Sequence, residues 1–307
     1  MIVTCGEALI DMLPRNGADG AAVFQPFAGG SVFNVAIGLG RLGVPTGFFG
    51  GLSTDFFGTT LREALEKSRV DVSFANLSDR PTTLAFVTLI EGQARYAFFD
   101  EHSAGRMLTD ADLPAFPAAL RALHFGSFSL AAEPCGSAYE TLARREHLSR
   151  VISLDPNIRP TLIKNRDAHI ARIERLVELA DIVKLSEDDL AWLAPGAAFD
   201  EFAGAWLDRG AKLVIMTRGV EGAVARSRRV AVSVPSVKVT VADTIGAGDS
   251  FSAALMARLD QHELLTKSAV ARLKEPQVAD ALAYAAKAAS ITCSRPGADP
   301  PWLSELS

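Results

Sequence analysis

Cysteine is scarce in this chain, and its few cysteines form no recognisable pair. Cys5, Cys135 and Cys293 are the three cysteines among 307 residues, and their spacing contains no C-x-x-C motif. A disulfide framework needs paired cysteines in an oxidising compartment, so we expect a protein of a reducing compartment. The N-terminal stretch has no basic region and reaches Glu7 early, which does not fit a secretory signal peptide. We therefore expect a cytoplasmic protein.

Excess positive charge and long apolar runs are also absent. Lysine and arginine number 31 against 36 aspartate and glutamate, so the formal net charge is −5 and a nucleic-acid partner is disfavoured. The longest uncharged run, residues 20–40, contains Gln25, Pro26 and Asn34, whereas a membrane span needs about 20 predominantly apolar residues. We expect this run to form a loop and then a buried helix, and we expect no membrane partner.

Several catalytic motifs are missing as well. The sequence has no G-x-x-x-x-G-K-[ST], no G-x-S-x-G and no H-E-x-x-H, which disfavours P-loop enzymes, serine hydrolases and histidine-bound metal sites. The segment Gly38-Leu-Gly40-Arg-Leu-Gly43 matches G-x-G-x-x-G, but a predicted helix rather than a strand precedes it. We expect these glycines to permit close helix packing. A dinucleotide-dependent oxidoreductase stays an alternative that rests on them alone.

Short apolar runs alternate with helical segments along the chain, which indicates an α/β fold. The apolar runs lack polar alternation, so their strands are expected to be parallel and covered by helices on both faces. No repeat or linker divides the sequence, and we expect one three-layer αβα domain over residues 1–307 with a mostly parallel central sheet. Expected strands cover residues 2–6, 46–50, 122–125, 151–155, 181–185 and 212–217, and expected helices cover residues 34–42, 58–67, 137–147, 167–179 and 199–209.

Two segments break the parallel pattern. Residues 82–90 and 94–100 flank Glu91-Gly92-Gln93 and are predicted to form an antiparallel hairpin. A hairpin inserted into a parallel α/β chain is often an appendage, so we expect it to act as a lid or an interface. A second hairpin is predicted at residues 222–233.

The strongest chemical signal is the sequence Asp243-Thr-Ile-Gly246-Ala-Gly248-Asp249-Ser-Phe, which precedes a predicted helix at residues 250–259. Glycines allow close backbone approach, and free N–H groups at a helix N-terminus bind anions. The carboxylate of Asp249 would repel a phosphate, but it suits a base that takes a proton from a hydroxyl attacking that phosphate. The alternative is that Asp249 only caps the helix.

Weaker signals follow the other predicted strands. In an open α/β sheet, ligands gather at the carboxyl ends of the strands, so these polar residues and glycines fit a nucleotide-and-substrate cleft. Each of them alone is better explained as a turn residue, a helix cap or a solvated loop residue. They are Asp11, the Gly29-Gly30-x-x-x-Asn34 segment, Asn157 and Arg159 after the fourth strand, Ser186 to Asp189 after the fifth, and Thr217, Gly219 and Gly222 after the sixth.

These motifs together resemble the ribokinase-like (PfkB) family of carbohydrate kinases, nearly end to end. The family's two signatures match Gly29-Gly30-x-x-x-Asn34 and the Asp243–Asp249 motif, in the same order. The sequences GEALIDM at residues 6–12, DPNIR at 155–159 and CSRPGA at 293–298 are most similar to its bacterial fructokinase branch. The resemblance implies a ribokinase-type fold with a small β-sheet lid, inserted from about residues 12–28 and 74–104, that also serves as a homodimer contact.

The resemblance also implies a role for each matched residue. Asp249 would be the catalytic base, and the N–H groups of Gly246, Ala247 and Gly248 would stabilise the transferring phosphoryl group. ATP and Mg²⁺ would be required, with K⁺ as a further cation. The sugar ligands would be Asp11, Gly29, Gly30, Asn34, Asn157 and Arg159; the ATP ligands Ser186, Thr217, Gly219 and Gly222 with Gly246 and Gly248; the indirect Mg²⁺ ligand Asp189; and the monovalent-cation ligands Asp243, Ile245 and Gly297.

The sequence departs from the family pattern at three places. Ser186 stands where the family's N-x-x-E motif has asparagine, Ala286 replaces an asparagine near the adenine, and Phe99-Asp100-Glu101 is acidic where many fructokinases have arginine. The leading function is ATP-dependent phosphorylation of fructose to fructose 6-phosphate. The alternatives are a 2-keto-3-deoxygluconate kinase, a ribose or nucleoside kinase, and a catalytically silent sugar-binding regulator.

Overall fold

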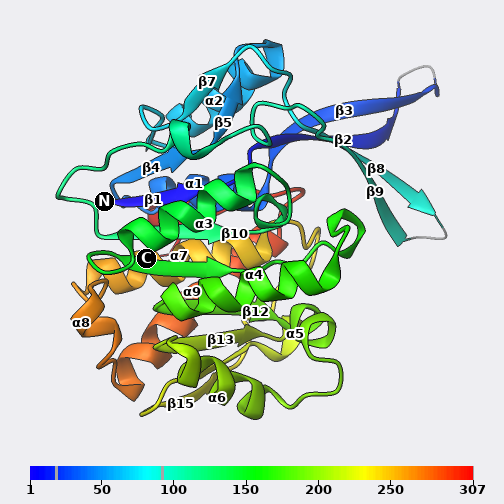
Figure 1. Cartoon of the computed structure of the whole chain (residues 1–307). Coiled ribbons are helices and arrows are strands. Elements are labelled where there is room, and N and C mark those ends of the chain that lie inside the picture. Colours follow the sequence, from blue (N-terminus) through cyan, green and yellow to red (C-terminus); the bar gives the residue numbers. More distant parts are fainter. Residues whose placement is uncertain (18–19, 91–92, 307) are drawn as a thin grey trace.

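A nine-stranded sheet forms the centre of the computed structural model, which describes residues 1–17, 20–90 and 93–306 (Figure 1). In the spatial order given below, all the strands from β13 through β1 to β6 are parallel to one another. Strands β14 and β15 add an antiparallel edge. The predicted parallel sheet and the hairpin at residues 222–233 are confirmed. In spatial order the strands are β15 (Ala231–Val234), β14 (Ala223–Arg226), β13 (Leu213–Thr217), β12 (Ile182–Ser186), β11 (Val151–Asp155), β10 (Ala122–Gly126), β1 (Ile2–Cys5), β4 (Thr46–Phe49) and β6 (Val70–Asp71).

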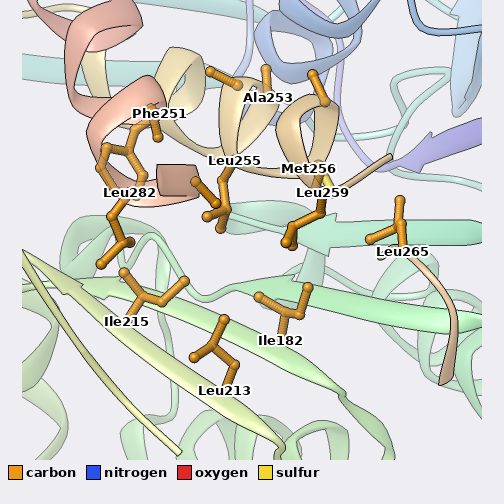
Figure 2. Packing of buried hydrophobic residues seen from close by; sticks show 14 of the residues in the cluster. Ile182, Leu213, Ile215, Phe251, Ala253, Leu255, Met256, Leu259, Leu265 and Leu282 are labelled. Carbon is orange, nitrogen blue, oxygen red and sulfur yellow. The ribbon is translucent and has the colours of Figure 1, made fainter. Parts of the chain in front are cut away.

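Helices cover both faces of this sheet and bury a separate apolar core on each. Phe251 and Leu255 lie in the first of these cores. They point toward Ile182, Leu213 and Ile215 of the sheet (Figure 2). The predicted three-layer arrangement is therefore confirmed. The first core is covered by α1 (Ser31–Arg41), α7 (Ala247–Gln261) and α9 (Glu275–Cys293), and the second by α3 (Cys135–Glu146), α4 (Arg166–Leu179) and α6 (Phe199–Arg209).

Helix α1 contains the first two glycines of the G-x-G-x-x-G match, and Gly43 follows its end. A Cβ atom on Gly40 would lie 2.1 Å from the carbonyl oxygen of Ser68, and one on Gly38 would lie 2.7 Å from Cβ of Ala253 in α7. Both glycines are needed for close packing, as the sequence predicted, and neither lies in a strand-to-helix loop. The prediction of a loop before this helix is wrong, because residues 22–29 form a strand that pairs with a neighbouring strand along its whole length.

A second, four-stranded sheet projects from one side of the main body (Figure 1, upper right). Its order is β3-β2-β8-β9; β2 pairs antiparallel with β3, and β8 antiparallel with β9, which confirms the predicted hairpin. Strands β2 and β8 are parallel to each other. The turn expected at residues 91–92 lies outside the described residues. The strands are β2 (Leu9–Asn16), β3 (Ala22–Gly29), β8 (Leu84–Ile90) and β9 (Gln93–Phe99).

The remaining elements are short connections around these two sheets. Within the described ranges, no helix has the length and apolar character needed to cross a membrane. The α-helices are α2 (Phe56–Lys67), α5 (Glu187–Leu193) and α8 (Lys267–Val270); β5 (Gly51–Ser53) pairs with β7 (Asn76–Ser78); and 3₁₀ turns cover Asp110–Asp112, Phe128–Leu130, Pro160–Leu162, Gly219–Glu221 and Leu303–Glu305.

Candidate active site

A cavity of about 310 Å³ lies where α1 and α7 begin, between the carboxyl ends of the strands and the projecting sheet. It brings together residues that the sequence predicted separately. Gly29 stands just beside it, because a Cβ atom there would lie 2.4 Å from Oδ2 of Asp11. The predicted residues in the lining are Asp11, Gly30, Asn34, Asn157, Arg159, Ile245, Gly246, Gly248 and Asp249, and Glu7, Ser31, Ser127 and Phe128 join them.

Asp249 is buried in the first turn of α7 and is held by side chains of α1. Its Oδ1 accepts a hydrogen bond from Oγ of Ser31 at 2.5 Å, and its Oδ2 accepts one from Nδ2 of Asn34 at 2.9 Å. The N-cap of α7 is Gly246, and no side chain caps this helix. The interpretation of Asp249 as a mere helix cap is therefore wrong. Its carboxylate faces the cavity instead.

The pKa of Asp249 is raised above its ordinary value, chiefly because burial disfavours the charged carboxylate. The hydrogen bonds from Ser31 and Asn34 work in the opposite direction. The negative charge of Asp155 adds to the rise, and the positive charge of Lys184 reduces it. A buried carboxylate with a raised pKa is a stronger base than an exposed one, which suits proton removal from a hydroxyl.

The start of α7 supplies backbone N–H groups beside this carboxylate. Gly246 has φ +75°, and a Cβ atom on it would lie 2.6 Å from Cβ of Ala298, so only glycine fits. The N–H of Ala247 donates to the carbonyl of Thr244 at 3.3 Å. The next amides of the first turn, including that of Gly248, have no acceptor within an α-helix. This end of the helix can therefore receive an anion.

Ser31 and Glu7 are site residues that sequence reasoning missed. Besides donating to Asp249, Oγ of Ser31 accepts a hydrogen bond from Nδ2 of Asn157 at 2.7 Å, and its backbone N–H donates to Oε1 of Glu7 at 2.9 Å. Asn157 reaches this position with φ +39°, in the left-handed region. The signals were present: Ser31 lies inside the Gly-Gly signature, and Glu7 follows β1 at the edge where ligands gather.

Glu7 and Asp11 are two further acidic side chains in this cavity, and burial raises the pKa of each. Burial raises the pKa of Glu7 to about 7, against the effect of hydrogen bonds from nearby donors. Burial also raises the pKa of Asp11 to about 6, and the charge of Asp249 adds to that rise while Arg159 reduces it. Arg159 lies exposed at the rim, where Nη1 donates to the carbonyl of Ile158 at 3.1 Å. The cavity is thus acidic, with one arginine at its edge.

Apart from Gly246 and Gly248, the residues expected to bind ATP and Mg²⁺ lie at or just after the ends of β12 and β13, outside the lining of this cavity. Ser186 caps α5, because its Oγ accepts a hydrogen bond from the N–H of Asp189 at 3.1 Å. Asp189 is buried, and its carboxylate accepts from the N–H groups of Ile158 (2.7 Å) and Ser186 (2.8 Å). That carboxylate therefore fixes two neighbouring loops.

The other residues expected near the nucleotide lie in turns, at a strand end or in the apolar core. Gly222 has φ +92°, and a Cβ atom on it would lie 2.1 Å from the carbonyl oxygen of Val234. Gly219 has φ +49° with no atom near the position of its missing Cβ. Thr217 ends β13, where its hydroxyl donates to the carbonyl of Leu185 at 3.4 Å. Ala286 packs in the apolar core of α9.

The residues expected to bind a monovalent cation do come together. Oδ1 of Asp243 accepts the N–H of Ile245 at 3.0 Å, and Oδ2 accepts the N–H of Gly297 at 2.9 Å. Ile245 and Gly297 thus meet the carboxylate of Asp243 through their N–H groups. Over the described residues, no group of three or more His, Cys, Asp or Glu side chains is placed to hold a metal ion.

Comparison with known proteins gives a consistent result. Residues 1–305 match the model of the pfkB family carbohydrate kinases. A fructokinase of Rhizobium leguminosarum bv. trifolii is 54% identical over 275 residues, covering 90% of this chain and 84% of that protein. A fructokinase of Salmonella typhimurium is 34% identical over 292 residues, covering 92% of this chain and 93% of that protein.

Solved structures agree with these sequence matches. The fructokinase of Xylella fastidiosa with bound ATP has a TM-score of 0.92 at 27% identity, covering 99% of this chain and 96% of that one. A double mutant of a fructokinase of Vibrio cholerae, bound to fructose, ADP and potassium, has a TM-score of 0.85 at 26% identity, covering 99% of this chain and 94% of that one. The ribokinase-type fold that the sequence predicted is confirmed. The chain is a sugar kinase, and it belongs to the pfkB family of carbohydrate kinases.

Proposed function

We propose that this kinase transfers the γ-phosphoryl group of ATP to the primary hydroxyl of D-fructose, producing D-fructose 6-phosphate and ADP. The observation that carries the proposal is the buried carboxylate of Asp249, held by Ser31 and Asn34 beside the backbone amides at the start of α7. The relatives that are called fructokinases, including one seen with fructose and ADP, support this choice of sugar. We place the protein in the cytoplasm, where ATP is available and three free thiols stay reduced.

The reaction follows from this arrangement. The sugar hydroxyl oxygen forms a bond to the γ-phosphorus while its proton passes to Asp249, and the bond from phosphorus to the oxygen of the leaving ADP breaks. The N–H groups of Gly246, Ala247 and Gly248 stabilise the charge on the transferring group. Asp11, Gly29, Gly30, Asn34, Asn157 and Arg159 bind the sugar hydroxyls, and Ser186, Thr217, Gly219 and Gly222 line the ATP site with Gly246 and Gly248.

Two cations belong to this proposal. Mg²⁺ would enter with ATP and neutralise phosphate charge. Asp189 would act on it indirectly, since its carboxylate already holds Ile158 and Ser186 in place. K⁺ would be held at Asp243 with the carbonyls of Ile245 and Gly297, close to the start of α7.

The test is an assay of ADP release from Mg·ATP with fructose, 2-keto-3-deoxygluconate, ribose, glucose, adenosine or no sugar, with and without K⁺. Fructose is expected to give the highest kcat/KM. A 2-keto-3-deoxygluconate kinase is the second candidate, because the guanidinium of Arg159 at the cavity rim can meet a carboxylate. Highest turnover on that acid, ribose or adenosine would replace fructose as the substrate. No turnover by a protein that still binds ATP and sugar would support a silent regulator.

Arg159→Ala is expected to raise the KM for sugar about tenfold, because a hydrogen bond to a charged group is worth about 1.5–3 kcal/mol and this one is exposed. The KM for ATP should stay within twofold. Arg159→Lys is the matched control and should recover only part of the loss, since lysine cannot bind in bidentate fashion. Steady-state kinetics with each substrate varied will measure both constants. A change confined to the KM for ATP would remove Arg159 from the sugar site.

We propose further that the projecting sheet is both the lid of the sugar site and a homodimer contact. Phe24, Phe86 and Phe99 form an aromatic cluster on it, with ring centroids 5.0 and 5.4 Å apart along the row. Phe24 is 42% and Phe99 62% exposed, and such exposed aromatic clusters mark contact surfaces. Phe99→Asp is expected to convert a dimer into a monomer in sedimentation velocity. A wild-type protein that is monomeric at micromolar concentration would contradict the dimer.

A further inference from the structure

A lysine lies buried in the middle of strand β12, beneath the start of α7. Nζ of Lys184 donates to Oδ2 of Asp155 on the neighbouring strand β11 at 2.9 Å, and the two side chains are 7% and 2% exposed. Oγ of Ser252 in α7 donates to the same carboxylate oxygen at 3.2 Å. The reaction described above gives this lysine no role.

Stability alone explains such a pair poorly. Removing a lysine and a carboxylate from water has a penalty of several kcal/mol per ion, and well-packed apolar side chains often replace buried ion pairs without loss. The surrounding strands β11 and β12 are otherwise rich in Val, Ile and Leu. A buried charge retained in that setting points to a use for the charge itself.

The ammonium group lies close to the catalytic end of α7. A Cβ atom on Gly248 would lie 3.1 Å from Nζ of Lys184. Nζ therefore lies just beyond the place where a side chain would begin on the residue that precedes Asp249. At such short range, and away from water, a unit charge acts strongly on its neighbours.

Titratable side chains from four elements face Lys184. They are Asp155 on β11, Asp189 on α5, Asp249 on α7, and His124 on β10. Burial and Lys184 lower the pKa of His124 to about 3, so this histidine is neutral. Burial works against the charged form of Lys184, but the three carboxylates outweigh it and raise its pKa. Lys184 is thus a permanent positive charge.

The charges facing Asp249 are mostly negative. Asp155 and Asp11 act on it from β11 and β2, and the positive charge of Lys184 on β12 acts in the opposite sense. Without a positive charge at this place, two carboxylates beside Asp249 would favour its protonated form, which cannot accept a proton from the sugar.

We propose that Lys184 is a positioning residue for catalysis, whose fixed charge offsets that of Asp155 and keeps Asp249 ionised at the pH where the kinase works. This inference rests on the proposed role of Asp249 as the base. In the reaction, Lys184 neither gains nor loses a proton; the proton of the sugar hydroxyl goes to Asp249.

The experiment measures kcat against pH, at saturating sugar and ATP, for Lys184→Met, Asp155→Asn and the double variant. The acid limb is the part of this curve where kcat falls as the pH is lowered and Asp249 takes up a proton. Lys184→Met removes a positive charge and should move the acid limb about one pH unit upward, and Asp155→Asn removes a negative charge and should move it about one unit downward. In the double variant the two shifts should largely cancel. If the acid limb stays in place in all three variants, the proposal is overturned. If Lys184→Met does not fold, as thermal unfolding will show, Asp155→Asn and the double variant carry the same test.

The chain offers a matched control at the other end of the same strand. Nζ of Lys267 donates to Oδ2 of the buried Asp181 at 2.7 Å, next to the first residue of β12. Lys267→Met breaks a similar pair and should lower the melting temperature without moving the acid limb. Equal shifts in Lys267→Met and Lys184→Met would show a general effect of destabilisation and would overturn the proposal.

Failure of this inference can be told apart from failure of the proposed function. Asp249→Asn is tested in the same buffers. If that variant keeps near-normal kcat, Asp249 is not the base, and both ideas fall. If it is inactive while Lys184→Met and Asp155→Asn leave the acid limb unmoved, only the role of Lys184 is wrong.

Discussion

Replacing Asp249 by asparagine is expected to lower kcat by about 10²–10⁴-fold, the range that a general base contributes. Asparagine has nearly the same shape and retains one oxygen toward the Nδ2 of Asn34, but it cannot take up the proton of the sugar hydroxyl. Dissociation constants for sugar and for ATP should change less than tenfold, because the cavity lining is otherwise intact. Steady-state kinetics and calorimetric titration will separate the two effects.

Ser31→Ala is the matched control for this result. It removes the hydrogen bond from Oγ to Oδ1 of Asp249 but leaves the carboxylate in place. We expect a loss of about tenfold, since hydrogen bonds to charged groups are worth about 1.5–3 kcal/mol. Near-normal kcat in Asp249→Asn would remove Asp249 as the base. If Ser31→Ala lowered kcat as much as Asp249→Asn, the loss would come from disturbed geometry of the site and not from the missing base.

The central sheet could be predicted from the sequence because its strands are buried on both faces. Runs such as Val151–Asp155 are mainly apolar and lack regular alternation, and the structure has this strand, buried throughout, with the predicted bounds. The projecting sheet carries no such pattern. Residues 22–26 on β3 are exposed, and Gln25 and Pro26 made the segment look like a loop. Its strand conformation comes from pairing with β2, a contact that local sequence does not reveal.

The candidate site shows the same limit. The residues of the Asp249 motif are adjacent in sequence, so its glycines and its carboxylate could predict a phosphate site with a base without knowledge of the fold. Ser31 contacts Asp249 across 218 residues of sequence, and Lys184 meets Asp155 across 29. Contacts of this kind exist only once the sheet has formed. Asp189 was expected near Mg²⁺, but the N–H groups of Ile158 and Ser186 that occupy its oxygens could not be predicted.

Glu7→Gln is expected to make the protein more stable at pH 8 and to change little at pH 5. Burial raises the pKa of Glu7 from 4.5 to about 7 in the folded state. Between these values the folded protein binds a proton that the unfolded chain releases, so stability falls as the pH rises from about 4.5 to 7. At pH 8 the charged side chain therefore reduces the free energy of unfolding by about 3 kcal/mol, at 1.36 kcal/mol for each pKa unit.

Glutamine avoids this loss because it stays neutral and its Oε1 can still accept the N–H groups of Ser31 and Val32. Urea unfolding at pH 5 and pH 8 will measure the difference, and the gain should appear only at pH 8. Glu63→Gln, on the exposed face of α2, is the control and should leave the pH dependence unchanged. If Glu7→Gln lost as much stability as the wild type between pH 5 and pH 8, some other group would be responsible. The opposite result, a loss of several kcal/mol at both values, would mean that the charge of Glu7 is needed to hold the start of α1.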